Sequence, residues 1–317
     1  MSSLIDQFPG PVLVLAGPTA SGKSSLALRL AEEAGGMIIN ADSMQVYADL
    51  RVLTARPSAA EEARVPHRLF GIYPAGQIRS AGLWLDGAVE AIKEARAAGL
   101  LPIVCGGTGF YLRALMQGLA PIPDIPDEVR QAVRARHAEI GGEAFHAEVA
   151  ELDPETARRL PPSDSQRLMR AMEVFKGTGK TLGQWYEIPA EAAPIDARFV
   201  TVLLMPPRPE LYRAIDERFE AMVEQGAGEE VKALLANGFQ ADLPAMKAVG
   251  VRELGAYQAG EITLEEAILQ SQRASRNYAK RQFTWLRHQL EPDLSYDSFG
   301  KDVETGPILD LIRETQA

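Results

Sequence analysis

The chain has 317 residues, of which 46% are hydrophobic and 24% are charged, and its formal net charge is −10 at pH 7. This composition is typical of a globular protein with one large or two modest domains, and the acidic balance disfavours a general nucleic-acid binder. No apolar run approaches the roughly 20 residues that a membrane span needs, and the first residues do not follow the plan of a signal peptide. A cytoplasmic protein without a membrane partner is expected.

Cysteine and histidine give no sign of a metal centre. Cys105 is the only cysteine, and the four histidines are scattered along the chain. A single thiol excludes an internal disulfide and a thiolate zinc cluster, and no two histidines have the spacing of paired ligands. No zinc is expected.

The first strong signal along the chain is a glycine-rich stretch that fits the phosphate-binding pattern G-x-x-x-x-G-K-[ST] at every fixed position. It follows a short apolar run at 12–16, expected as a strand, and it opens a helical pattern. The glycines let the backbone curl so that N–H groups point at an anion, and the helix adds the positive end of its dipole. Lys23 supplies a charge for the outer phosphate, and the Ser24 hydroxyl is placed to ligate Mg²⁺. The stretch predicts a diphosphate site without saying which diphosphate, and it consists of Gly17, Pro18, Thr19, Ala20, Ser21, Gly22, Lys23 and Ser24.

Strands and helices are predicted to alternate over about the first 115 residues. Apolar runs at 36–42 and 100–105 indicate strands, and helical spacing covers 84–98 and begins again at 110. This alternation predicts a parallel sheet with helices on both faces and with ligands at the carboxyl ends of its strands. The expected fold class is α/β, with a core like that of the P-loop NTPases.

A proline-rich break at 121–126 interrupts the alternation. Consecutive helices are predicted from 127 to about 175, after which a buried strand returns at 199–205. Three further helices are expected at 209–225, 227–237 and 263–290. The pattern therefore predicts a discontinuous α/β core at 1–118 and 197–290, an inserted all-helical domain at 119–196, and an acidic tail at 291–317.

Two predicted strand ends carry residues that could do chemistry. Asp42 comes just past the second strand, where it could be a Mg²⁺ ligand, a general base, or merely the N-cap of a helix at 43–45. The third strand is followed by glycines and Thr108, which suit close approach of a base or an alkyl diphosphate but would also make an ordinary β–α turn.

Two other stretches are rich in cations. Gln166, Arg167 and Arg170 share one helical face, where they could pair with bases and phosphates, although a solvated helix face would look the same. Residues 267–290 carry five cations and no acid, which is unusual for a merely solvated helix. This stretch could dock a polyanion or pack against acidic parts of the same chain. Four of its cations follow a single helical stripe: Arg273, Arg276, Lys280 and Arg287.

In their order along the chain, these motifs resemble those of the tRNA dimethylallyltransferases, the isopentenyltransferases that prenylate an anticodon-loop adenosine. The resemblance extends to about Leu290 and therefore covers most of the chain. One departure lies at 48–57, where the family has a glycine-containing stretch and a lysine before the proline. The landmarks that carry the resemblance are residues 17–24, 42–47, 65–67, 106–108, 166–171, 250–254 and 278–285.

The resemblance implies transfer of a dimethylallyl group from dimethylallyl diphosphate to the exocyclic amine of the adenosine 3′ to the anticodon. The substrates would be tRNAs that read codons starting with U. The resemblance implies Asp42 as the general base and Thr108 as a residue that positions the base or the diphosphate. It also implies Lys23 and an arginine on the diphosphate, Arg213 by best match and Arg218 as the second choice.

The resemblance also implies Mg²⁺ on Ser24, a monomer, and a tRNA anticodon stem-loop whose outer side the helical insertion covers. One alternative is a P-loop kinase of a small metabolite, in which Asp42 would activate a hydroxyl. A second is a non-catalytic nucleotide switch, against which the absence of an N-K-x-D guanine-recognition tetrad argues. The residues implied to contact tRNA are Asp42, Ser43, Met44, Gln45, Thr108, Gln166, Arg167, Leu168, Met169, Arg170, Lys247, Arg252, Arg273, Arg276, Lys280 and Arg281.

Overall fold

The computed structural model describes residues 10–188 and 194–316. Parts of the predicted core, insertion and tail, namely residues 1–9, 189–193 and 317, lie outside the described residues. The chain divides into two compact units, Met1–Met116 with Pro194–Ala317, and Gln117–Ala193. These limits fall within a few residues of the expected insertion at 119–196.

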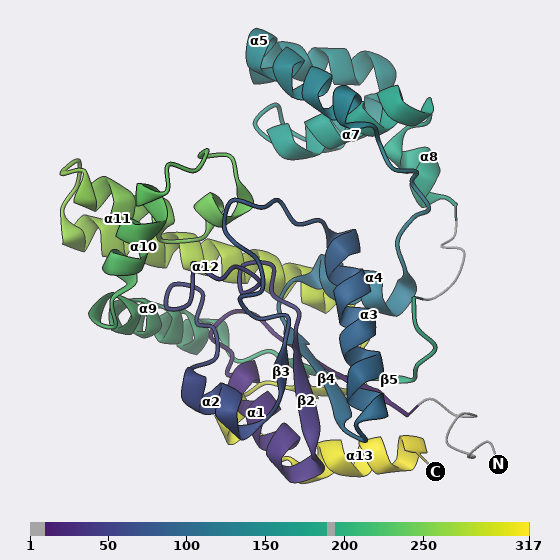
Figure 1. Ribbon diagram of the computed structural model, residues 1–317, viewed down its shortest axis with the longest axis vertical. Helices are drawn as coiled ribbons and strands as arrows, with labels where there is room; N and C mark the ends of the chain where they lie inside the picture. Colours follow the sequence, from purple (N-terminus) through teal and green to yellow (C-terminus); the bar gives the residue numbers. More distant parts are fainter. Residues whose placement is uncertain (1–9, 189–193, 317) are drawn as a thin grey trace. The chain divides into compact units, whose positions relative to one another are not determined.

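The first unit is built on a six-stranded parallel sheet with the strand order β3-β2-β4-β1-β5-β6 (Figure 1). Its central strands are apolar and buried along their whole length, as expected for parallel strands with both faces covered. The predicted parallel α/β fold is confirmed, and the sheet has two strands that were not predicted, β3 and β6. The strands are β1 (Val12–Ala16), β2 (Gly36–Asn40), β3 (His67–Arg68), β4 (Leu101–Gly106), β5 (Phe199–Leu204) and β6 (Leu294–Tyr296).

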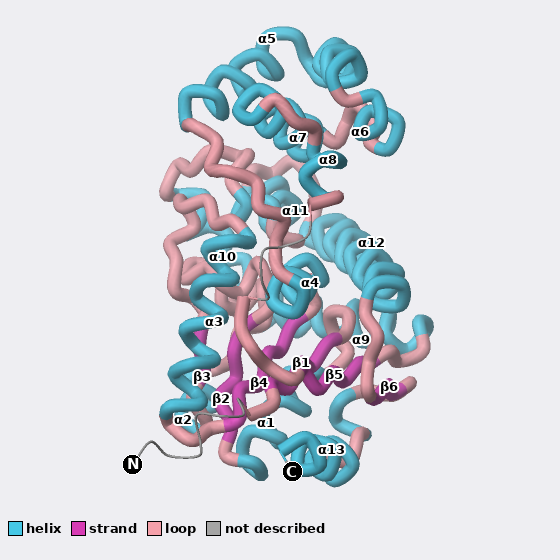
Figure 2. Tube along the Cα trace, turned by 90° about the vertical axis from the view of Figure 1, so that its right-hand side faces the viewer, coloured by secondary structure: helices cyan, strands magenta, loops and turns pink. Residues whose placement is uncertain are grey.

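Helices cover the sheet and extend beyond its carboxyl edge. Side chains of α1 and α13 pack on one face, in a core with Leu13 and Val202, while α3 packs against β2 and β4. Helix α12 packs against α9 and α11 (Figure 2). The helices of this unit are α1 (Lys23–Ala34), α2 (Ala59–Arg64), α3 (Ala81–Ala97), α4 (Gly109–Gln117), α9 (Arg208–Glu224), α10 (Ala227–Ala236), α11 (Val251–Gln258), α12 (Leu264–Gln289) and α13 (Gly306–Gln316), with 3₁₀ turns η2 (Pro244–Lys247) and η3 (Gly300–Asp302).

The segment expected as an acidic tail is part of the core, which corrects that expectation. Strand β6 pairs with β5, and α13 buries Ile308 and Ile312 against the sheet. The excess of acidic residues hid an amphipathic helix, because the charged side chains of α13 face solvent while its apolar ones face the core. The α/β unit therefore extends through the described C-terminal residues.

The second unit is all-helical, as predicted. Helix α5 contains a non-helical residue, Gly141 (φ 75°), and the next break follows at Asp153, which caps α6. Phe145, Val149 and Leu168 form the centre of its own small core. The helices are α5 (Asp127–Leu152), α6 (Pro154–Arg159), α7 (Ser165–Thr178) and α8 (Leu182–Tyr186).

Within the described ranges, no helix is both long enough and apolar enough to cross a membrane.

Candidate active site

The sequence motifs of the first unit meet at the carboxyl ends of neighbouring strands. The glycine-rich loop joins β1 to α1, Asp42 follows β2, and Thr108 follows β4. The chain crosses from β1 to β2 and returns to β4 between them, so the strand order reverses here. Such a reversal point is where open α/β sheets bind their ligands.

The glycine-rich loop is held by contacts from distant helices. Gly22 has a left-handed conformation (φ 81°) at the start of α1, and the Lys23 ammonium donates to the carbonyl of Pro18 (3.2 Å). The Thr19 hydroxyl accepts a hydrogen bond from Arg218 of α9, and the Thr19 N–H donates to the Gln282 side chain of α12 (2.8 Å). The loop is therefore shaped by residues from the second half of the chain.

Gln282 is a site residue that the sequence reasoning missed. It is buried, and its amide also donates to the carbonyl of Gly107 (2.9 Å), so it joins the loops after β1 and β4. Gly107 has no room for a side chain, because a Cβ would overlap the Gln282 amide and lie 2.9 Å from the carbonyl oxygen of Gly17. The sequence offered one signal for Gln282: it falls on the same face of α12 as the apolar residues Phe283 and Leu286.

Asp42 lies in a tight turn that its own side chain stabilises. Its Oδ1 accepts the N–H of Met44 (2.9 Å), and its N–H donates to the Asn40 side chain (2.8 Å). Residues 43–45 form a turn and not a helix, so the interpretation of Asp42 as a helix cap is wrong. Thr108 supports the same turn, because its hydroxyl accepts the N–H of Ser43 (3.0 Å).

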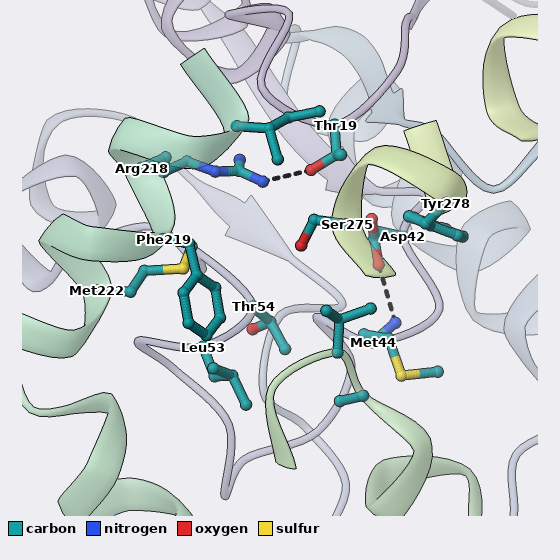
Figure 3. Close-up of a pocket in the computed structure, with 13 residues that line it drawn as sticks. Thr19, Asp42, Met44, Leu53, Thr54, Arg218, Phe219, Met222, Ser275 and Tyr278 are labelled. Atoms are coloured by element: carbon teal, nitrogen blue, oxygen red, sulfur yellow. Dashed lines mark hydrogen bonds between the residues drawn. The ribbon is translucent and has the colours of Figure 1, made fainter. Parts of the chain in front are cut away.

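Two cavities share Asp42 as a lining residue. The first, of about 80 Å³, is polar at Thr19, Asp42 and Arg218 and apolar at Leu53, Phe219 and Met222 (Figure 3). The second contains Lys23, Ser24 and Cys105. Asp42 lines both cavities, so the cavity with the apolar wall and the cavity that contains the phosphate-loop cation share this residue.

The electrostatics of these cavities favour an anion. Burial lowers the pKa of Lys23, an effect that Arg218 adds to and that Asp42 and Cys105 oppose. Burial likewise lowers the pKa of Arg218, again opposed by Asp42. A bound anion would favour the charged form of both groups. Burial raises the pKa of the Cys105 thiol to about 11, so this thiol is protonated at neutral pH and is not a nucleophile.

The two candidate arginines on α9 differ in their surroundings. Arg213, the first choice from the sequence, is exposed and lines neither cavity. Arg218 lines the first cavity and bonds Thr19 of the glycine-rich loop. The two residues are five positions apart on α9, so they point in different directions. The structure therefore favours Arg218 as the anion ligand.

Glu230 of α10 fixes one wall of the first cavity and was also missed by the sequence reasoning. Its carboxylate accepts the backbone N–H groups of three successive residues: Arg51 (2.5 Å), Val52 (2.9 Å) and Leu53 (2.8 Å). Leu53 in turn lines the cavity. Gln45 holds the same loop by donating to the carbonyl of Thr54 (2.9 Å), so its amide N–H is used in the fold. This loop belongs to the segment where the sequence departs from the family pattern.

Other residues expected to contact tRNA lie at the edge of the first cavity or beyond it. Met44 lines the cavity, and Ser43 is half-buried beside it. Lys247 and Arg252 are exposed and flank Ala248 and Val249, which are lining residues.

The cationic stripe on α12 is only partly open to solvent. Arg276 of the stripe forms an ion pair with Asp216 of α9. The other stripe residues and their neighbour are exposed, namely Arg273, Lys280, Arg287 and Arg281. The alternative of internal pairing thus holds for Arg276, and its expected role as an RNA contact is not supported. The reason lies in the neighbouring helix, which the helical spacing of α12 could not reveal.

The candidates on α7 also divide into two groups. Gln166 and Arg167 are exposed on the helical unit, and Arg170 is half-buried 3.6 Å from Glu173. Leu168 is fully buried in the core of that unit, and Met169 packs against it. The expected RNA contact of Leu168 is therefore wrong for this structure, because its side chain fills the helical core.

A divalent metal would have to rely on few protein ligands here. In the part of the chain that the structure describes, no three His, Cys, Asp or Glu residues form a metal-holding group. The Ser24 hydroxyl and the Asp42 carboxylate share the second cavity, and such oxygen donors fit Mg²⁺. Mg²⁺ typically uses one or two protein oxygens together with phosphates and waters, so the residues present fit this ion.

Comparisons with known proteins identify the family of the chain. The sequence model of a family described as IPP transferase matches residues 45–289, and one described as isopentenyl transferase matches residues 10–71. A tRNA dimethylallyltransferase of Rhodospirillum centenum is 52% identical over 299 residues, which are 94% of this chain and 95% of that protein. Another, of Parvibaculum lavamentivorans, is 53% identical over 281 residues, 89% of each chain.

Solved structures give the same result. The full-length tRNA isopentenylpyrophosphate transferase of Bacillus halodurans matches with a TM-score of 0.67 and 31% identity, covering 96% of this chain and 95% of that one. A eukaryotic dimethylallyltransferase acting on tRNA shares the fold, with a TM-score of 0.79 and 24% identity over 96% of this chain and 78% of that one. The predicted resemblance is confirmed: the chain belongs to the tRNA dimethylallyltransferase family.

Proposed function

We propose that this enzyme transfers a dimethylallyl group from dimethylallyl diphosphate to the exocyclic amine of the adenosine 3′ to the anticodon. The tRNAs are those that read codons starting with U. The observation that carries the proposal is that Asp42 lines two cavities, one with an apolar wall and one containing Lys23. A prenyl chain and a base need the apolar space, and a diphosphate needs the cations beside it.

The chemistry follows from the groups that line these two cavities. The adenine amine attacks C1 of the dimethylallyl group, the bond from C1 to oxygen breaks, and diphosphate leaves with the bonding electrons. The amine is barely basic, so it must lose a proton as the new bond forms, and Asp42 accepts that proton. Lys23 and Arg218 stabilise the charge that grows on the leaving diphosphate.

Two further groups assist this reaction. Thr108 holds the turn that carries Asp42 through its bond to the Ser43 N–H (3.0 Å), which keeps the base in place. Mg²⁺ would be held by Ser24 and would add positive charge against the diphosphate when bound.

The adenosine must leave its stack to reach Asp42, so the anticodon loop binds with this base flipped out. Met44, Lys247 and Arg252 lie in or beside the first cavity and are suited to contact the loop around that base. If the helical unit covers the outer side of the anticodon loop, it needs exposed hydrogen-bond donors for the RNA. Gln166 and Arg167 of that unit are exposed and carry such donors.

The proposed reaction is tested by incubating purified protein with unmodified tRNA, Mg²⁺ and dimethylallyl diphosphate, followed by nucleoside mass spectrometry. We expect N6-(dimethylallyl)adenosine in tRNAs that read codons starting with U, and inorganic diphosphate as the second product. Consumption of ATP in the absence of tRNA, without any modified nucleoside, would instead support the kinase alternative.

The exposed cations of α12 should contribute to RNA affinity, and the paired one should not. Each phosphate contact releases counterions, so it adds about 0.7 to the slope of log affinity against log salt on single-stranded RNA. We expect the double variant Arg273→Ala, Lys280→Ala to flatten this slope and to weaken all tRNAs alike. Arg276→Ala is the matched control, since its guanidinium already pairs with Asp216. An unchanged slope in the double variant would show that Arg273 and Lys280 do not contact RNA phosphates.

A further inference from the structure

The C-terminal segment is anchored to strand β5 before it reaches the glycine-rich loop. The Asp293 carboxylate accepts the N–H of Thr201 (2.7 Å), and the Asp293 N–H donates to the Thr201 carbonyl (2.9 Å). Strand β6 then pairs with β5, and α13 buries Ile308 and Ile312 in the core. Between these two anchors the chain passes the loop at Gly300.

Gly300 contacts the loop through its backbone. Its N–H donates to the carbonyl of Ser21 (2.9 Å). A Cβ on Gly300 would overlap the carbonyl oxygen of Gly22, and a Cβ on Gly22 would lie 2.9 Å from the Gly300 nitrogen. The two backbones therefore pack directly against each other, an approach that only glycine permits at these positions.

The helix that follows the loop is tied to the same residue. The guanidinium of Arg29 in α1 donates to the carbonyls of Gly300 (2.5 Å) and Val303 (2.9 Å). Because α1 begins at Lys23, Gly300 is linked both to the turn before the helix and to its second turn. The relative position of the turn and the helix is thereby fixed.

This contact sets the direction of one peptide group. The C=O and N–H of a trans peptide point in opposite directions. Since the Ser21 carbonyl points at Gly300, the N–H of Gly22 points away from it. Successive N–H groups that point into such a loop are what binds a phosphate.

We propose that Gly300 is a positioning residue for the glycine-rich loop, which it holds in the conformation that binds diphosphate. The proposal rests on the proposed function only for the identity of the ligand. It assigns to the C-terminal segment a part in substrate binding, although no side chain of that segment lines either cavity.

The test compares Gly300→Ala with Gly306→Ala, since a Cβ on Gly306 would meet no other atom within 4 Å. Binding of inorganic pyrophosphate in the presence of Mg²⁺ is measured by calorimetry, and tRNA binding is measured without pyrophosphate. We expect Gly300→Ala to weaken pyrophosphate about 10- to 100-fold, the effect of losing one hydrogen bond to a charged ligand. Affinity for tRNA should stay unchanged, and Gly306→Ala should behave as wild type.

Arg29→Lys provides a second variant if the methyl group of Gly300→Ala prevents folding. Lysine keeps the charge but cannot bond both carbonyls in the same geometry, so a smaller loss of pyrophosphate affinity is expected. Wild-type affinity in the variants that fold, an equal loss of tRNA affinity, or a wild type that does not bind pyrophosphate would overturn the proposal. A wild type that binds pyrophosphate but modifies no tRNA would refute the proposed function alone.

Discussion

Replacement of Asp42 by Asn should lower the single-turnover rate of dimethylallyl transfer by about 10²–10⁴-fold, the usual effect of removing a general base. The asparagine oxygen can still accept the N–H of Met44, which lies 2.9 Å from Oδ1, so the turn should persist. An amide cannot take the proton from the adenine amine. We therefore expect the affinities for tRNA and for dimethylallyl diphosphate to change little. Quenched-flow measurement of the first turnover separates an effect on the rate of transfer from an effect on substrate binding.

Asp49 offers a matched control for this experiment. Its carboxylate also accepts a backbone N–H, that of Ala75 (2.7 Å), but it lines neither cavity. Asp49→Asn should therefore keep the normal transfer rate. If Asp42→Asn transfers the prenyl group at a near-normal rate, Asp42 has only the structural role of holding its turn.

Removal of either half-buried cation, Lys23 or Arg218, should lower turnover strongly. We expect Lys23→Ala and Arg218→Ala each to reduce kcat by about 10²–10³-fold, because each loses a donor placed where charge develops on the leaving diphosphate. Burial lowers the pKa of both groups, so the folded protein holds two cations at some cost until an anion binds. Pyrophosphate should accordingly raise the Tm of the wild type more than that of either variant, which a thermal shift measurement with and without the ligand checks.

Arg213→Ala separates the two arginines of α9. Its exposed side chain lines neither cavity, so its kcat should remain within about twofold of the wild type, as for most surface substitutions. A loss in Arg213→Ala as large as that in Arg218→Ala would contradict the assignment of Arg218 to the diphosphate.

The elements that were predicted well are those with a strong local signal. Strand β1 is an uninterrupted apolar run, and α12 begins with a capping box in which the Thr263 and Glu266 side chains bond each other's backbone N–H. Strands β3 and β6 have two and three residues, too few to show a period, and their pairing depends on neighbours distant in the chain. The amphipathic α13 was missed because its segment was judged by net charge.

The site was predictable where a motif or a strand end marks it. Lys23, Asp42 and Thr108 follow the ends of predicted strands, and all three gather at one edge of the sheet. The residues that shape their surroundings have no such signal. Gln282 and Glu230 are ordinary polar residues on helices, and their importance comes from the backbone groups that they reach across the fold.

The bond between Thr19 and Gln282 has a consequence for how the protein folds, because it joins residues 263 positions apart. Contacts of such long range are made late in folding, because closing a large loop costs chain entropy before the energy of the new contact can offset that cost. Strand β1 can pair earlier with β4, because Leu13 and Ile103, which face each other across these strands, are only 90 positions apart. A chain in which only β1 and β4 have paired would therefore still lack a shaped anion site, and substrate would stabilise only the completed enzyme.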